Sequence, residues 1–281
     1  MHLLSSLKIQ QAVYRAISEI TFNCDPQVHQ ALSKAMANEH DEIAKDVLNT
    51  ILTNHSLSPA DKIPLCQDTG TTVVFAELGT DLHITDGSLY EAINNAVRQA
   101  QQDCPLRASI VNEALFARHN TLDNTPAIIH TEFTAGHALR LVIAQKGGGA
   151  ENMSFLQMMS PAASSDDIVS YICDGVLAAG SRPCPPLILG IGIGSNFEGV
   201  ALLAKKAIFE ELGRANPDPR YAELEARIKA ELNARGCGVQ GLGGNNTVLA
   251  VHILQAPCHI ASLPVAVNLE CHAHRHCEVW L

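Results

Sequence analysis

Apolar residues recur at every third or fourth position over long parts of the chain, the spacing that places them on one face of a helix. In residues 7–21 this stripe is formed by Ile9, Val13, Ile17 and Ile20. Two further helix starts are indicated. Asp25 suits the N-cap position and Pro26 the first helical position, and Ser88 and Glu91 have the spacing of a capping box. The patterns predict helices over residues 7–21, 26–53, 88–101, 166–179, 197–212 and 217–234.

Shorter apolar runs between these segments predict β-strands. The runs are 72–76, 127–133, 138–145, 187–194 and 247–254, and residues 260–267 form a further apolar segment. We expect the second and third strands to pair as a hairpin through Gly136-His137, because glycine suits a tight turn. The mixed order of elements predicts an α+β fold, with mixed helices and sheet in a single domain over residues 1–281.

Composition narrows the class of protein. Hydrophobic residues make up 47% of the chain and charged residues 17%, so a folded core is expected. A net charge of −10 without any basic run argues against nucleic-acid binding. No apolar run has the length of a membrane span, and the N-terminus lacks the apolar core of a signal peptide. Nine cysteines suggest reduced thiols, so we expect a cytoplasmic protein.

Three of the cysteines lie in predicted loops, far apart along the chain. Cys66 is part of Pro-Leu-Cys-Gln-Asp-Thr-Gly (64–70), Cys184 stands between prolines, and Cys271 follows an apolar segment. They are 118 and 87 residues apart, whereas structural zinc sites use close pairs. This spacing favours a cluster assembled by the folded chain. Three thiolates would leave one iron of a [4Fe-4S] cluster open as a Lewis acid.

Other residues that could bind a metal or ligand also have simpler structural interpretations. Cys24, Cys104 and Cys173 lie in or beside predicted helices and are expected to be structural. The His-rich tail 271–277 could bind zinc, but a solvated tail is the simpler interpretation. The glycine run after Lys146 indicates close approach of a ligand or another chain, or else a loose loop.

Several longer motifs, in this order along the chain, resemble the alpha subunit of the iron–sulfur hydro-lyases of the class I fumarase and L-tartrate dehydratase family. The resemblance covers residues 7–276. It rests on the segments PLCQDTG (64–70), PLR (105–107), KGGGAENMS (146–154), CPP (184–186), GIGSN (192–196), GLGGNNT (241–247) and PVAVNLEC (264–271).

The resemblance implies that Cys66, Cys184 and Cys271 bind a [4Fe-4S] cluster, the same three cysteines chosen from their loops. It also implies a substrate pocket lined by Gln67, Asp68, Arg107, Gly148 and Gly149, to which the position of Lys146 adds another candidate cation. Asp68 and Gln67 are the candidate catalytic residues. Asp68 could relay a proton or stabilise its own turn. Arg107 could bind a carboxylate through two parallel hydrogen bonds or form a surface ion pair.

The sequence departs from the family in two places. His272 stands where many relatives have Trp, and nothing in the chain matches the β region that carries the proposed general base. We therefore expect a separate beta subunit, an α2β2 assembly and a small dicarboxylate substrate. The expected reaction is reversible hydration of fumarate to malate, favoured by the glycine motifs. The alternatives are L-tartrate dehydration and, from another class, a non-catalytic iron–sulfur or zinc sensor.

Overall fold

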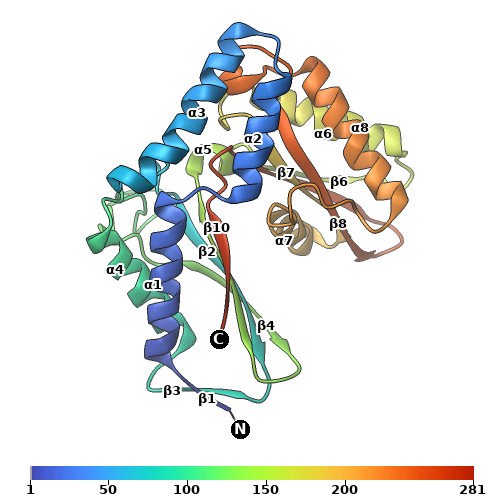
Figure 1. The fold of residues 1–281 in the computed structure, drawn as a ribbon. Coiled ribbons are helices and arrows are strands. Elements are labelled where there is room, and N and C mark those ends of the chain that lie inside the picture. The colour runs from blue at the N-terminus through green and yellow to red at the C-terminus, as the bar shows by residue number, and fades with distance from the viewer. Residues whose placement is uncertain (1) are drawn as a thin grey trace. The chain divides into compact units, whose positions relative to one another are not determined.

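The computed structural model describes residues 2–281, and the chain divides into two compact units with one four-stranded sheet each (Figure 1). The first unit comprises Met1–Asp25, Asn54–Gly148 and Arg275–Leu281, and the second comprises Pro26–Thr53 and Gly149–His274. Helices and sheets with both parallel and antiparallel pairs occur in the same chain, which confirms the predicted α+β class.

The first unit contains a four-stranded sheet with the strand order β10-β5-β2-β4. It also contains a separate two-stranded parallel sheet, formed by β1 and β3. Its elements are β1 (His2–Ser5), α1 (Ser6–Phe22), β2 (Thr71–Gly79), β3 (Leu82–Thr85), α4 (Leu89–Asp103), β4 (Ile128–Thr134), β5 (Leu139–Lys146) and β10 (His276–Trp280). The helix α3 (Glu42–Asp61) begins in the second unit and ends in the first.

Helices α1 and α4 pack on one face of this sheet. The predicted stripe of α1 is buried there, with Ile9 and Val13 at 0% exposure, against alternate residues of β5 such as Leu141 and Ile143. The period of 3.6 on the helix and of 2 on the strand places these side chains in one core. Both helix predictions are confirmed, and Ser88 caps α4 by accepting the N–H of Glu91 at 3.1 Å.

The predicted hairpin between the strands at 127–133 and 138–145 is wrong, although both strands exist. β2 lies between them, parallel to β4 and antiparallel to β5. The connection passes over the end of β2 at Gly79, where a Cβ would lie 2.4 Å from the carbonyl oxygen of Gly136. Local alternation indicates a strand but carries no information about its partner, which is a long-range choice.

The second unit has the sheet order β6-β9-β7-β8, with β7 and β8 parallel and the other pairs antiparallel. Its elements are α2 (Pro26–Asn38), α5 (Gly148–Glu151), β6 (Phe155–Met159), α6 (Ser165–Ala179), β7 (Leu187–Ser195), α7 (Phe197–Ala207), α8 (Pro219–Arg235), the 3-10 turn η1 (Val239–Gly241), β8 (Val248–Cys258) and β9 (Leu263–Glu270). The start of α5 is contributed by the first unit.

The two faces of β7 pack against different helices. Its odd-numbered residues, including Leu189 and Ile191, are buried with α6 and α8. Its even-numbered glycines allow α7 to approach the other face, because a Cβ on Gly190 or Gly192 would lie 2.2 or 2.3 Å from a carbonyl oxygen of that helix. These glycines therefore serve helix–strand packing.

The predicted continuous helix over 26–53 is wrong, since α2 ends at Asn38 and α3 starts at Glu42. The break is made by Glu39, which is 2% exposed and accepts the N–H groups of His40 and Asp41 at 2.9 and 3.1 Å. Asp41 then caps α3 by accepting the N–H of Ala44 at 2.9 Å. The predicted helix at 197–212 is also shorter, because α7 ends at Ala207.

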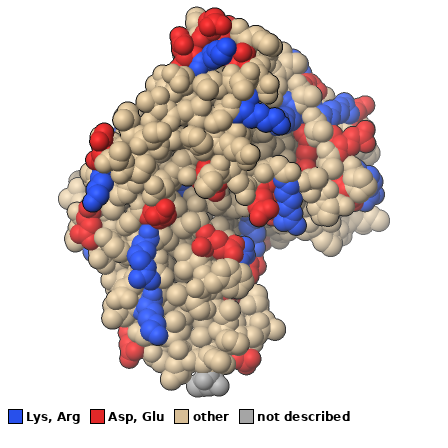
Figure 2. All heavy atoms as spheres, in the orientation of Figure 1, with Lys and Arg blue, Asp and Glu red and all other residues tan. Residues whose placement is uncertain are grey.

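Acidic and basic side chains are scattered over the visible surface in Figure 2 rather than gathered by sign. Among residues 2–281, no helix has the length and apolar character needed to cross a lipid bilayer.

Candidate functional site

The turn 66–70 lies directly before β2 and is held in place by Asp68. Its Oδ1 accepts the N–H of Gly70 at 3.0 Å, and its Oδ2 accepts the N–H of Gly148 at 2.8 Å. The carbonyl oxygen of Asp68 accepts Nη2 of Arg275 at 2.6 Å. One residue thus joins the cysteine turn to the glycine run and to the C-terminal segment.

Strand register explains why these three segments meet. Thr71 lies opposite Lys146 in the antiparallel β2–β5 pair, and β10 begins opposite the last residues of β5. The start of β2, the end of β5 and the start of β10 therefore share one end of the sheet. Gly70 has φ +74°, and a Cβ there would lie 2.2 Å from the carbonyl oxygen of Lys146, so only glycine fits.

The candidate side chains of this turn differ in access. Leu65 is anchored by its N–H, which donates to the carbonyl of Thr21 at 2.9 Å. Cys66 is half-buried and Gln67 is exposed, so both can face a ligand while the residues around them are fixed. Lys146, which lies opposite Thr71 at the end of β5, is 3% exposed, so its ammonium is held there at a desolvation cost.

The expectation of a solvated His-rich tail is wrong. Ala273, His274 and Arg275 are at most 4% exposed, and residues from His276 onward form β10. The alternation of Cys277, Val279 and Leu281, all packed on the core of the first unit, was the signal for this strand.

Arg275 is the main residue that sequence reasoning missed. In the described part of the chain, its Nη1 is buried and has no hydrogen-bond partner, and its guanidinium forms no ion pair. Because Nη2 donates to the backbone of Asp68, this cation is fixed two residues from Cys66. A buried cation without a counter-ion is costly unless an anion binds to it. The location therefore suits a negatively charged ligand.

Arg107 lies in the irregular segment between α4 and β4, on the first unit. Its side chain is exposed and, within residues 2–281, makes no hydrogen bond or ion pair. Its backbone is fixed by Asn124, which is 3% exposed, accepts the N–H of Ser109 at 2.7 Å and donates to the carbonyl of Arg107 at 3.0 Å. The surface ion pair considered for Arg107 is not formed, and its guanidinium stays available.

In the second unit, Cys184 occupies the loop between α6 and β7. It is exposed and has φ +59°, a left-handed conformation that is uncommon for a residue with a side chain. The loop is fixed by the N–H of Cys184, which donates to Ser181 at 3.0 Å, and by Gln240, whose N–H donates to Pro185 at 2.8 Å. The strain is thus maintained by contacts that hold the thiol at the surface.

Cys271 follows the last residue of β9, and its half-buried thiol lies 3.7 Å from Oε1 of Glu270. In the antiparallel β7–β9 pair, Ile188 lies opposite Glu270. The loop that carries Cys184 enters β7 at the end of the sheet where the chain leaves β9. The fold of the second unit therefore brings Cys184 and Cys271, which are distant in sequence, to the same sheet end.

Two glycine motifs flank this end. A Cβ on Gly149 would lie 3.4 Å from the carbonyl oxygen of Arg182, beside the Cys184 loop, and one on Gly241 would lie 2.5 Å from Cβ of Ser181. The second motif is anchored by Glu39, which accepts the N–H of Asn245 at 3.0 Å and Nδ2 of Asn246 at 2.7 Å.

Burial opposes ionisation of the Glu39 carboxyl. The hydrogen bonds from Asn246 and from three backbone N–H groups outweigh this effect and lower its pKa. The ionised carboxylate of Glu39 therefore holds the glycine-rich turn in place through its hydrogen bonds to Asn245 and Asn246. Nothing in the local sequence distinguishes Glu39 from a surface glutamate of a helix, so its role becomes visible only in the fold.

Three of the other six cysteines differ from these candidates in their ionisation. Burial raises the pKa of Cys104, that of Cys173 to about 11 and that of Cys277 to about 12, so these side chains stay neutral thiols. Among residues 2–281 no cysteine forms a disulfide, and no three His, Cys, Asp or Glu side chains gather as a metal site. Cys66 belongs to the first unit, whereas Cys184 and Cys271 belong to the second.

Comparison with known proteins defines the family. The family model described as fumarate hydratase (fumerase) matches residues 10–280. A protein of Methanocaldococcus jannaschii, provisionally named L(+)-tartrate dehydratase subunit alpha, is 34% identical over 275 residues, which cover 96% of each chain. The L(+)-tartrate dehydratase subunit alpha of Escherichia coli K12 is 29% identical over 272 residues, covering 95% of this chain and 89% of the other.

These matches extend over almost the whole chain and include every motif described above. The chain therefore belongs to the fumarate hydratase family of hydro-lyases.

Proposed function

We propose that the chain is the alpha subunit of an iron–sulfur hydro-lyase that adds water reversibly to the double bond of fumarate. The observation that carries this proposal is the gathering of the motifs. In each unit, segments far apart in sequence meet at one sheet end and present a cysteine, bare glycine backbone or a cation there. The proposed catalytic alpha domain spans residues 1–281 and uses both units.

The proposed cofactor is a [4Fe-4S] cluster held by Cys66, Cys184 and Cys271. The donor set fits such a cluster, since all three thiols are at least partly accessible, unlike Cys104 and Cys173, which are 6% and 0% exposed. The buried Arg275 guanidinium near Cys66 also fits an anionic group. A bound cluster with three thiolate ligands supplies a Lewis acid at its fourth iron.

Cations of this chain bind the proposed dicarboxylate. The Arg107 guanidinium is exposed and has a planar fork that matches a carboxylate, whereas the buried Lys146 ammonium offers a point charge. At an effective dielectric constant near 20, one close ion pair contributes roughly 4 kcal/mol before desolvation. Local pairing of this size outweighs the unfavourable field of a chain with net charge −10.

Neutral donors complete the binding surface. The exposed amide of Gln67 can donate to a substrate oxygen, and the backbone at Gly148 and Gly149 allows close approach because no Cβ covers it. These groups orient the substrate and leave its reacting carbons to the catalytic groups.

Asp68 is proposed to position the site and to act as a hydrogen-bond partner or proton relay. Each carboxylate oxygen already accepts one backbone N–H, so the orientation of the carboxylate is fixed. Each oxygen retains acceptor capacity, through which Asp68 can receive a hydrogen bond from the water or hydroxyl group that the reaction transfers.

The general base is assigned to a separate beta subunit, and the working assembly to two copies of each chain. The naming of both relatives as subunit alpha, at nearly full coverage, supports this partner. Neither His252, which is buried in β8, nor His274, which is 1% exposed, is assigned as the base. Because thiolate ligands require a reducing compartment, the proposal places the assembly in the cytoplasm.

L-tartrate is the second candidate substrate, because both relatives carry that name. The test is to reconstitute the chain anaerobically and measure hydration of fumarate and dehydration of malate and L-tartrate, with and without the beta chain. We expect turnover only in the mixture. Equal turnover by the isolated chain would show that a base within this chain has been overlooked.

The cluster ligands are tested separately from activity. Serine in place of Cys66, Cys184 or Cys271 should abolish the visible absorbance of the cluster, because each thiolate is one of three anchors. Cys104→Ser and Cys173→Ser are the matched controls and should keep close to four irons per chain. Stoichiometric zinc without iron or sulfide in the anaerobic protein would contradict the assignment.

A further inference from the structure

The second unit contains a hollow of about 770 Å³ that includes none of the proposed cluster or substrate ligands. It is lined by α2, α8, the first half of β8 and the loop 212–215. Its size is within the range of small-molecule sites, roughly 300–1,000 Å³.

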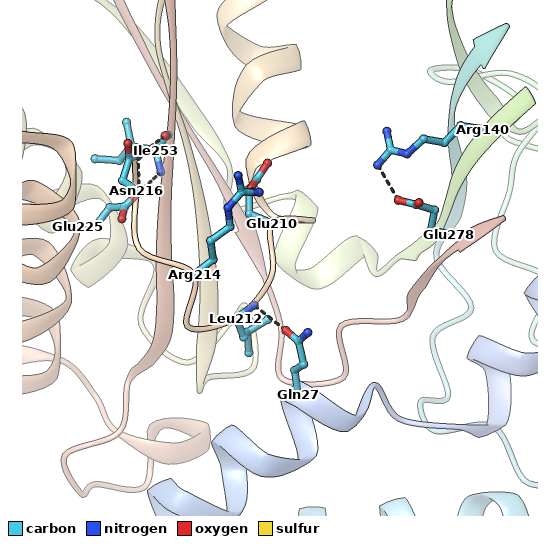
Figure 3. A network of polar contacts seen from close by, with 9 residues as sticks. All are labelled: Gln27, Arg140, Glu210, Leu212, Arg214, Asn216, Glu225, Ile253 and Glu278. Atoms are coloured by element: carbon cyan, nitrogen blue, oxygen red, sulfur yellow. Dashed lines mark hydrogen bonds and ion pairs between the residues drawn. The ribbon is translucent and has the colours of Figure 1, made fainter. Parts of the chain in front are cut away.

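The walls of the hollow are fixed by hydrogen bonds (Figure 3). The N–H of Leu212 donates to Oε1 of Gln27 at 2.8 Å, which joins the loop to α2. Nδ2 of Asn216 donates to the carbonyl of Ile253 at 2.8 Å and to Oε1 of Glu225 at 2.9 Å, which joins the loop to β8 and α8. A ligand would therefore meet a preformed site and would not have to order it.

The charge of the lining is mostly positive. The lining includes three cationic residues, which are Lys34 on α2, Arg214 in the loop and Lys229 on α8. It includes one carboxylate, that of Glu225. Arg214 pairs with Glu210 at 3.1 Å, but within residues 2–281 neither lysine forms an ion pair. On a chain of net charge −10, this is a local excess of cations.

The two lysines influence each other. Desolvation, followed by the charge of Lys34, lowers the pKa of Lys229, whose Nζ donates one hydrogen bond to the carbonyl of Leu249 at 2.5 Å. Two ammonium groups on different helices thus repel each other with no counter-ion between them. A bound anion would relieve this repulsion.

His252 provides an independent observation at the same place. It lines the hollow from β8 and is only 5% exposed, and its Nε2 has no hydrogen-bond partner among the described residues. Buried polar atoms normally have hydrogen-bond partners, so an unpartnered ring nitrogen beside two lysines without ion pairs is a second observation that points to a ligand site.

We propose that this hollow is a second ligand site, which binds a small organic anion with at least two negative charges between Lys34 and Lys229. Phosphate esters and polycarboxylates share this chemistry. The hollow is larger than a free phosphate ion requires, so the organic part of the ligand would contact the alanine-lined walls of α2 and α8. The proposal does not depend on the iron–sulfur function.

The test is isothermal titration of the full chain at constant ionic strength with inorganic phosphate, glutarate and 3-phosphoglycerate. We expect 3-phosphoglycerate or glutarate to bind, and Lys34→Ala and Lys229→Ala each to weaken that binding at least tenfold. Lys45→Ala, which removes an exposed lysine of α3 outside the hollow, is the matched control and should bind normally. His252→Asn should also weaken binding.

The titration distinguishes the ligand classes directly. Binding of 3-phosphoglycerate alone would assign a phosphate ester, and binding of glutarate alone a polycarboxylate. Binding that persists unchanged in both lysine variants lies elsewhere on the chain and overturns the proposal, as does the absence of binding by all three anions. Lys34 is exposed, so its variant should fold normally, which circular dichroism checks.

Discussion

Removal of the Asp68 carboxylate should loosen the cysteine turn by a predictable amount. The carboxylate accepts two backbone N–H groups, those of Gly70 and Gly148, at 3.0 and 2.8 Å. A hydrogen bond to a charged group contributes about 1.5–3 kcal/mol, and the half-buried position reduces this value by solvation. We therefore expect Asp68→Ala to lower the free energy of unfolding by about 2–4 kcal/mol.

Asp68→Asn separates the two hydrogen bonds. The amide oxygen can still accept one N–H, whereas the amide nitrogen faces the other donor and cannot accept it. The expected loss is about half that of the alanine variant, or about 1–2 kcal/mol. In activity assays with the beta chain, both variants should lose turnover, because the turn carries Cys66 and Gln67.

The assay is urea unfolding of the cluster-free chain, followed by far-ultraviolet circular dichroism. Asp81→Ala is the control, since Asp81 is exposed in the same unit and its side chain makes no hydrogen bond or ion pair within residues 2–281. It should change stability by less than about 0.5 kcal/mol. An Asp68→Ala variant as stable as this control would refute the argument that the carboxylate holds the turn.

Three further variants test other parts of the structure. Arg107→Lys should lower kcat/KM at least tenfold with the cluster spectrum retained, because lysine keeps the charge but loses the two-point fork; normal kinetics would make Arg107 superficial. Gly70→Ala should destabilise the chain by more than about 1 kcal/mol, measured by urea unfolding, because alanine is strained at positive φ and would clash with Lys146; unchanged stability would contradict this register. Burial, aided by the charge of Lys229, lowers the pKa of His252 from 6.5 to about 4, so the unfolded chain binds the extra proton and stability falls as pH drops from 6.5 towards 4. His252→Asn should remove about 3 kcal/mol of this pH dependence, and parallel pH profiles would show that the histidine does not titrate as stated.

Much of the secondary structure followed from local patterns. The stripe of α1, the capping serine of α4 and the buried run of β7 all predicted their elements, because burial of one helix face or strand face imposes a period on the chain. The break between α2 and α3 did not follow from such a pattern. It depends on Glu39, whose carboxylate accepts hydrogen bonds from residues about 206 positions away.

The family and its chemistry were also readable from the sequence. The motifs around Cys66, Cys184 and Cys271 are short and contain turn-forming residues, so their chemical character is local. Their assembly is not local. Cys184 and Cys271 reach one sheet end only because β7 and β9 pair in antiparallel register.

By itself, the sequence determined the α+β class, the family and the candidate ligands, since these depend on local spacing and on motifs. Only the tertiary structure decided that β2 separates β4 from β5, and that the C-terminal segment is buried as β10. It also decided that Arg275 lies beside the cysteine turn with an unsatisfied nitrogen. Strand partners and buried charges are set by contacts between distant segments, and the periodicity of a single segment carries no record of those contacts.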